Sequence, residues 1–151
     1  MKTYKKLGYE YTLSKVKGSE FQRVKIKSSK DIADFAKVLY KDDIEIYESF
    51  FIITLNQANI ITGWAKISQG GISATIVDVR LVSKIAIDSL SSCIVLIHNH
   101  PSGNLFPSKS DDLITTKIKE GLSLFDIKVL DHIILTERNK YFSYTDEGKI
   151  Q

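Results

Sequence analysis

The hydrophobic residues of the chain fall into short apolar runs separated by amphipathic stretches. Two of the runs, residues 50–55 and 93–97, are continuous and rich in β-branched or aromatic residues, which is typical of strands buried on both faces. The glycine pair Gly70-Gly71 ends a more polar run that follows a turn at 56–59. The pattern as a whole predicts strands at 50–55, 60–68, 93–97, 127–136 and 141–144.

Three intervening stretches repeat apolar residues at spacings of three and four, the pattern of a helix with one buried face. Ser28 or Ser29 can cap the first helix, and Asp78 can cap the second. The expected buried positions of the three helices are, in turn, Ile32, Phe35, Ala36, Val38 and Leu39; Leu81, Val82, Ile85, Ala86 and Leu90; and Leu113, Ile114, Ile118 and Leu122. Because strand pairs alternate with helices, we predict an α/β fold with a mixed sheet flanked by helices.

The composition agrees with one ordinary globular domain. The chain has 151 residues, of which 43% are hydrophobic and 26% are charged. No apolar run approaches the ~20 residues of a membrane span, and the first residues lack the apolar core of a signal peptide, so we expect a cytoplasmic protein. The single cysteine, Cys93, excludes a disulfide framework and a multi-cysteine zinc site. A metal would therefore need histidine and carboxylate ligands.

The basic residues are concentrated at the amino-terminal end. Residues 1–27 carry a net charge of +6, whereas the whole chain carries +3. Together with Tyr4, Tyr9 and Tyr11, these lysines could contact a nucleic-acid backbone. The alternation at 9–13 and 24–26 instead favours two strands joined around Gly18, with lysines that keep an edge soluble. We predict the packed strand or hairpin and keep nucleic-acid binding as the alternative.

The residues best suited to chemistry lie after the run at 93–97. His98 and His100 are two positions apart at a strand end, so their side chains point to the same face. Ser108 and Asp111 have the spacing of a capping box at the start of the third helix. Two histidines and one carboxylate can hold a zinc ion and leave a fourth position for water. Alternatively, the histidines are plain loop residues and Asp111 serves only the helix terminus.

The spacing of His98, His100, Ser108 and Asp111 resembles the JAMM motif of the JAB/MPN metalloproteases. The stretches HNHPSG at 98–103 and PSKSD at 107–111 are most similar to its bacterial RadC-like branch. The resemblance covers about residues 28–148. It implies a basic extension at 1–27 and a single RadC-like JAB/MPN domain at 28–151, with a mixed sheet related to that of cytidine deaminases. Longer RadC proteins carry a helix-hairpin-helix module associated with DNA, for which 27 residues are too few.

The same resemblance implies two catalytic residues. Glu48, just before a buried strand, would hold the water on the metal and shuttle its proton, and Ser108 would steady the oxyanion. Partial desolvation by the apolar run would raise the pKa of Glu48 toward a useful value. Glu45 is the competing base. We expect Asp112 to be a poorer ligand than Asp111, and His132 to be packed in the core or to support a ligand. Cys93 is expected to be a core residue. Trp64 is expected to be half-buried in the strand at 60–68.

The resemblance therefore implies a zinc-dependent hydrolase that cleaves a peptide, amide or isopeptide bond in an unidentified peptide or protein substrate. One alternative is a DNA-repair-associated or other nucleic-acid accessory protein whose metal site is structural or vestigial. A metal-dependent nuclease or deaminase is the other, and the deaminase is disfavoured because the chain lacks the C-x-x-C ligands of that class.

Overall fold

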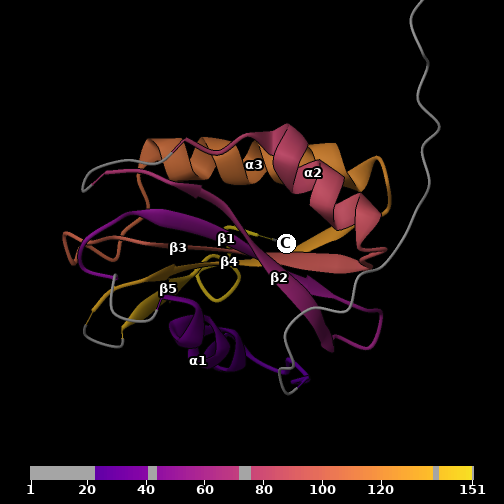
Figure 1. Ribbon diagram of the computed structural model, residues 1–151, viewed down its shortest axis with the longest axis horizontal. Coiled ribbons are helices and arrows are strands. Elements are labelled where there is room, and N and C mark those ends of the chain that lie inside the picture. The colour runs from indigo at the N-terminus through magenta and orange to yellow at the C-terminus, as the bar shows by residue number, and fades with distance from the viewer. Residues whose placement is uncertain (1–22, 41–43, 72–75, 138–139, 151) are drawn as a thin grey trace, which may run out of the picture.

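A five-stranded mixed sheet with helices on both faces forms the domain (Figure 1). The computed structural model describes residues 23–40, 44–71, 76–137 and 140–150. Helix α1 covers one face of the sheet, and α2 and α3 lie side by side on the other. The elements are α1 (Ser29–Tyr40), β1 (Ser49–Leu55), β2 (Ile61–Gln69), α2 (Val79–Asp88), β3 (Cys93–Asn99), α3 (Lys109–Ser123), β4 (Lys128–Leu135) and β5 (Tyr141–Ser143). The predicted α/β class is confirmed.

The strand order β2-β1-β3-β4-β5 places the two most apolar strands at the centre. β1 is antiparallel to both β2 and β3, whereas β3 and β4 are parallel and are joined through α3. Every residue of β1 and β3 is buried, which agrees with their continuous apolar runs. In the β1–β3 pairing, Phe50 lies opposite His98. The end of β3 and the start of β1 therefore meet at one edge of the sheet.

Alternate residues of the central strands pack into two separate hydrophobic cores, one on each face of the sheet. Phe51 and Ile53 of β1 pack with α1, whereas Phe50 and Ile52 pack with α2 and α3. The same alternation along β3 turns Ile97 toward α1 and Leu96 toward the α2–α3 side. By the same alternation, the side chain of His98, which follows Ile97, lies on the α2–α3 side of the sheet. The candidate site described below lies on that side.

Four apolar residues predicted on buried helix faces are exposed, and the prediction was wrong for them: Val38, Leu81, Leu90 and Leu113. Leu90 lies beyond α2, which ends at Asp88, and its φ of 54° belongs to the left-handed region of a helix terminus. Leu113 is 73% exposed because the buried stripe of α3 follows Thr115 and Ile118 instead. Apolar spacing alone does not show which of two overlapping stripes faces the sheet.

The predicted amino-terminal strand pair is described only in part. Lys25 forms an isolated antiparallel bridge with Ile60, and the amide of Ile26 donates to the carbonyl of Asn59 over 2.8 Å. The predicted partner at 9–13 and the turn at Gly18 lie outside the described residues. Among the helices that the structure describes, none combines the length and the apolar character needed to cross a membrane.

Candidate metal centre

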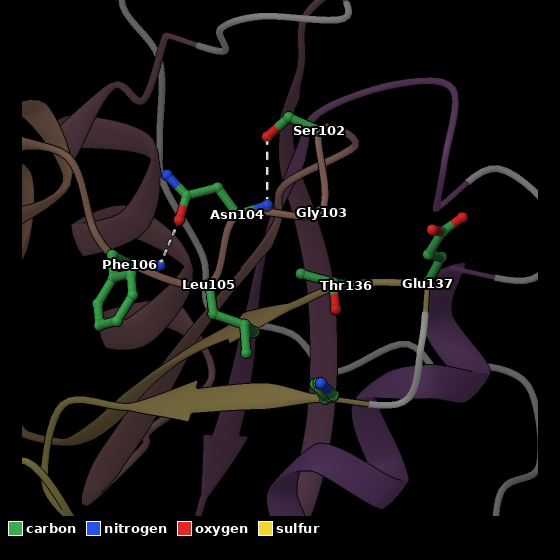
Figure 2. Close-up of a pocket in the computed structure, with 8 residues that line it drawn as sticks. Ser102, Gly103, Asn104, Leu105, Phe106, Thr136 and Glu137 are labelled. Carbon is green, nitrogen blue, oxygen red and sulfur yellow. Dashed lines mark hydrogen bonds between the residues drawn. The ribbon is translucent and has the colours of Figure 1, made fainter.

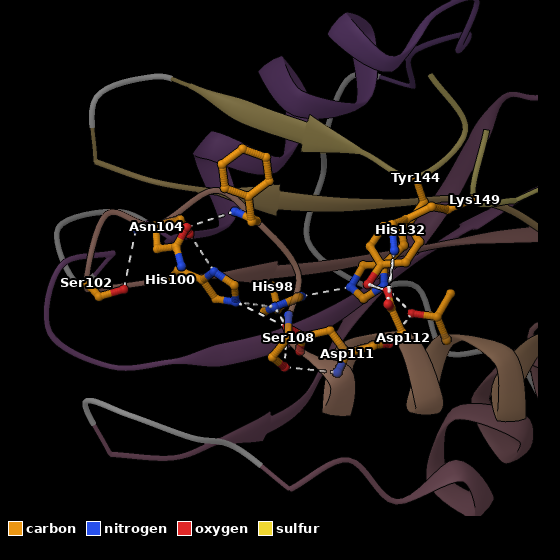
Figure 3. A network of polar contacts seen from close by, with 12 residues as sticks. His98, His100, Ser102, Asn104, Ser108, Asp111, Asp112, His132, Tyr144 and Lys149 are labelled. Carbon is orange, nitrogen blue, oxygen red and sulfur yellow. Dashed lines mark hydrogen bonds and ion pairs between the residues drawn. The ribbon is translucent and has the colours of Figure 1, made fainter. Parts of the chain in front are cut away.

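Three separate parts of the chain bring four potential ligands together at one edge of the sheet. Glu48 immediately precedes β1, His98 and His100 lie at the end of β3, and Asp111 lies in the first turn of α3. One ligand atom of each residue lies within 4.8 Å of the ligand atoms of the other three. Figure 3 shows the two histidines and Asp111 converging. This is a group of residues that could hold a metal ion.

The separations between these atoms agree with a small tetrahedral ion. The Nε2 atoms of His98 and His100 are 2.9 Å apart. The carboxylate of Asp111 lies 3.3 Å from Nε2 of His98 through Oδ1 and 3.5 Å from Nε2 of His100 through Oδ2. A tetrahedral ion bound at about 2 Å requires ligand atoms about 3.3 Å apart. The three side chains therefore need only small adjustments to share one ion.

A chain of hydrogen bonds on the side of the His98 ring that faces away from the cluster orients this histidine as a potential metal ligand. The hydroxyl of Thr115 donates to the carbonyl of Asp111 over 2.6 Å, so its oxygen accepts from Nδ1 of His132 at 2.6 Å. Nε2 of His132 then accepts from Nδ1 of His98 at 2.7 Å. Burial lowers the pKa of His132 well below its usual value, which keeps that ring neutral. The chain of bonds fixes the orientation of the ring, with Nε2 of His98 facing the cluster.

His100 is oriented in the same way by the loop that follows it. Its Nδ1 donates to the backbone carbonyl of Asn104 over 2.6 Å, so Nε2 is the ring nitrogen that faces the cluster. Burial alone would lower the pKa of His100, but its hydrogen bond with Asp111 raises it overall. Both histidines thus present the nitrogen that a metal ion requires.

Asp111 serves the helix and the cluster together. Its Oδ2 accepts from the backbone amide and from the hydroxyl of Ser108, each over 2.7 Å, and its own amide donates to the Ser108 hydroxyl at 3.1 Å. The predicted capping box is confirmed. Burial would raise the pKa of Asp111, but hydrogen bonds from His100, His98 and Ser108 outweigh it and hold the pKa far below its usual range. Asp111 is therefore ionised, as a ligand must be.

Glu48 lies beside these three residues and is almost fully buried, with 8% of its surface exposed. Desolvation raises the pKa of its carboxyl, although the nearby histidines oppose the shift. The competing base, Glu45, is exposed, and a hydrogen bond with Glu137 raises its pKa. Glu45 is absent from the cluster, so the geometry favours Glu48.

A cavity of about 230 Å³ opens onto the cluster. Glu48, His98 and Asp111 line one side of it, and the rest of its wall is mostly apolar: Phe50, Ile76, Val77, Ser110 and Ile114. A second cavity of about 380 Å³ lies between the 102–106 loop and the end of β4 (Figure 2). Its lining contains none of the four potential ligands. Of these two cavities, both lined by residues that the structure describes, the first is the one that opens onto the cluster.

The other candidates lie where the sequence suggested. Asp112 accepts hydrogen bonds from Tyr144 and Lys149 instead of joining the cluster (Figure 3). Cys93 is buried, and burial raises the pKa of its thiol. Trp64 lies in β2 with 44% of its surface exposed and packs near Phe51. His132 supports His98, as described above.

Sequence reasoning missed two groups that orient the histidines. Thr115 follows Asp111 by one helical turn, a spacing that would place both on one helix face, but nothing local links it to His132. The carbonyl of Asn104 has no sequence signature at all, because every residue carries one.

The profile of the RadC-like JAB domain matches residues 26–149. The chain belongs to the RadC-like JAB domain family. It is 44% identical over 124 residues to a UPF0758 protein of Flavobacterium johnsoniae, an alignment that covers 82% of this chain and 53% of the relative. A UPF0758 protein of Staphylococcus haemolyticus is 37% identical over 127 residues, covering 84% and 54%. This RadC-like chain thus spans about half the length of the curated relatives it matches.

Proposed function

We propose that this RadC-like domain is a zinc-dependent hydrolase that cleaves a peptide, amide or isopeptide bond with water. The observation that carries the proposal is the convergence of two histidine Nε2 atoms and an ionised aspartate beside a desolvated glutamate, at the end of an open cavity. Zinc would replace the protons that these nitrogens share with each other and with Asp111. Two nitrogens and one carboxylate form a ligand set typical of hydrolytic zinc sites. His98, His100 and Asp111 would hold the ion, which when bound supplies Lewis acidity toward water and the scissile carbonyl.

Glu48 would perform the proton transfers. Its carboxylate lies within the cluster but on a separate segment, so it can accept a proton from the attacking water without being needed as a ligand. The raised pKa brings the group closer to the operating pH, which favours both accepting that proton and returning it to the leaving amine. The apolar wall of Phe50, Val77 and Ile114 limits access of bulk water to that exchange.

Ser108 is proposed to donate a hydrogen bond to the developing oxyanion. Its hydroxyl hydrogen is committed to Asp111 in this structure, so this role requires the hydroxyl to rotate toward the substrate. The backbone amide of Ser108 also donates to Oδ2 of Asp111, which keeps the aspartate in place when the hydroxyl turns. The capping and catalytic roles are therefore compatible within one turnover.

We expect Ser108→Ala to lower kcat by about 10²–10³, the usual loss of one oxyanion donor, and to leave zinc bound. Loss of the cap should also lower the melting temperature slightly. Steady-state kinetics, metal analysis and thermal unfolding would separate these effects. Thr116→Ala is the matched control, because that exposed hydroxyl donates to the carbonyl of Asp112 on the same helix and does not contact the cluster. An unchanged kcat in Ser108→Ala would remove Ser108 from the mechanism.

The central test is metal analysis followed by a cleavage screen. The purified protein should bind one zinc per chain, and the zinc-loaded form should cleave members of a peptide and isopeptide library that the chelated form leaves intact. The readout is mass spectrometry of the products. A protein that binds no zinc when zinc is supplied near neutral pH, or cleaves nothing when loaded, would contradict the hydrolase proposal.

The alternative of a nucleic-acid accessory protein depends on the basic residues at 1–27, of which 1–22 lie outside the described structure. A steep fall of duplex affinity with salt would support that partner, because phosphate contacts release counterions. A peptide or protein substrate and a cytoplasmic location remain part of the main proposal.

A further inference from the structure

The segment that carries Glu48 is bound by one fully buried side chain, that of Asn99. Asn99 is the last residue of β3 and lies between the two histidines in sequence. Because successive side chains alternate across a strand, Asn99 points to the α1 side of the sheet while His98 points to the opposite side.

Asn99 contacts the chain on both sides of Glu48. Its Oδ1 accepts from the amide of Ser49 over 2.8 Å, and its Nδ2 donates to the carbonyl of Tyr47 over 2.8 Å. The second hydrogen of Nδ2 is donated to the carbonyl of Ile44 over 2.6 Å. The primary amide therefore uses both of its hydrogens and its oxygen on the 44–49 segment, a combination that a neutral amide can supply and a carboxylate cannot.

The strand register explains why the backbone amide of Ser49 is bound by a side chain and not by the backbone of β3. Phe50 and His98 are the last paired residues of the β1–β3 ladder. If the register continued, Ser49 would lie opposite Asn99 and Glu48 opposite His100. The amide of Ser49 instead bonds to the side chain of Asn99. The contact between the two segments thus passes from the backbone to one side chain at the point where Glu48 enters the cluster.

Other contacts hold the remaining backbone groups at this point. The amide of Glu48 donates to the carbonyl of Gly71, and its carbonyl accepts from the amide of Gly70. The hydroxyl of Tyr40 donates to the carbonyl of Ser49 over 2.9 Å. These bonds come from the two residues that follow β2 and from the last residue of α1, so removing the amide of Asn99 should loosen the 44–49 segment without detaching it from the sheet.

We propose that Asn99 is a positioning residue for Glu48: it binds Tyr47 and Ser49 and so sets where the carboxylate stands relative to His98, His100 and Asp111. Its effect on catalysis depends on the proposed hydrolase function, whereas its hold on the 44–49 segment does not. The metal ligands are oriented by Thr115, His132, Asn104 and Ser108, none of which contacts Asn99 through a described bond. Asn99 therefore affects the base and not the metal.

The experiment compares Asn99→Ala and Asn99→Asp with the parent protein. Asn99→Asp keeps the shape and the acceptor for Ser49 but lacks the two donors. We expect both variants to bind zinc as the parent does and to keep its KM, while kcat falls about 10–100-fold, the usual result of a misplaced catalytic group. Amide hydrogen exchange of the zinc-loaded proteins should become faster across 44–49 and remain unchanged in the first turn of α3.

Thr54→Val is the matched control. Thr54 is also buried, lies in β1 and shares a 2.9 Å hydrogen bond with Thr62 at the other end of that strand. Its loss should lower stability with no change in kcat and no faster exchange at 44–49. Comparison with this variant separates a general loss of stability from a change at Glu48.

The outcomes are distinguishable. Unchanged exchange at 44–49, or loss of zinc in both Asn99 variants, would overturn the positioning role, and so would a parent-like kcat despite faster exchange. Failure of the parent protein to hydrolyse any library member would overturn the proposed function, and exchange would still test the contact. If neither variant folds, hydrogen exchange measured by NMR on the parent protein tests the contact. Slow exchange of the Asn99 side-chain amide and of the Ser49 amide supports it, and exchange as fast as that of a solvent-exposed amide overturns it.

Discussion

Replacing Glu48 with glutamine should lower kcat by about 10²–10⁴ and leave the bound zinc in place. The amide cannot accept the proton of the attacking water, but it has nearly the same size as the carboxylate and can take its place in the wall of the cavity. Metal analysis and steady-state kinetics on a library-derived substrate would measure the two properties separately. Loss of activity with retained metal is the signature of a missing base.

Glu45→Gln is the matched control for that variant, because it makes the same substitution three residues earlier at an exposed position. It should cleave at the parent rate. If Glu48→Gln cleaves as fast as the parent and Glu45→Gln does not, the base has been assigned to the wrong carboxylate. If Glu48→Gln loses its zinc, Glu48 is a ligand and the proposed division of roles is wrong.

His100→Ala should lose zinc and activity together. In the proposed site the ring would supply one of three protein ligands, and the remaining pair, His98 and Asp111, would not complete a tetrahedral site with the same affinity. Zinc titration against a competing chelator, with thermal unfolding at saturating zinc, would measure the loss. The stabilisation that zinc gives the parent should vanish, because a ligand stabilises only the state that binds it.

His132→Phe is a second variant for the same zinc titration, and it should weaken zinc binding less than His100→Ala does. The aromatic ring can still pack between Phe50 and Tyr144, but both hydrogen bonds of the imidazole are lost. Loss of such a supporting contact typically weakens metal binding about 10–100-fold without abolishing it. A His100→Ala protein that holds zinc more tightly than His132→Phe would contradict the ligand assignment.

The elements whose signal is local were predicted closely from the sequence. The caps at Asp78 and Ser108 and the turn before β2 are formed by contacts within a few residues. The apolar runs of β1 and β3 indicate strands buried on both faces, although they do not show which strands pair with them. The JAMM-like spacing likewise predicts that His98, His100 and Asp111 belong to one site, and the structure brings them together. These features are set by backbone geometry over one strand end and one helical turn.

What sequence reasoning missed depends on contacts between distant segments. The sequence predicts a buried position for Leu113, and this prediction is wrong. Which side of α3 is buried depends on how the helix packs on the sheet, and the apolar spacing of the helix alone does not show it. Thr115 and His132 support His98 only because β4 lies beside β3. The contact of Asn99 with Tyr47 and Ser49 joins segments about fifty residues apart in sequence, and no periodicity in either segment predicts it.

The proposed ligands and the proposed base differ in the length of the chain segment that must close into a loop to bring each of them to the site. His98 at the end of β3, His100 just after it and Asp111 in the first turn of α3 are separated only by the short β3–α3 connection, so assembling them requires closure of a small loop. Glu48 reaches them only after β1 has paired with β3, a contact between distant parts of the chain with a higher entropic cost. A chain with a damaged β1 could therefore still capture a metal ion while lacking the base. For this fold, a full complement of bound metal would measure the integrity of the β3–α3 connection and not the fraction of catalytically competent molecules.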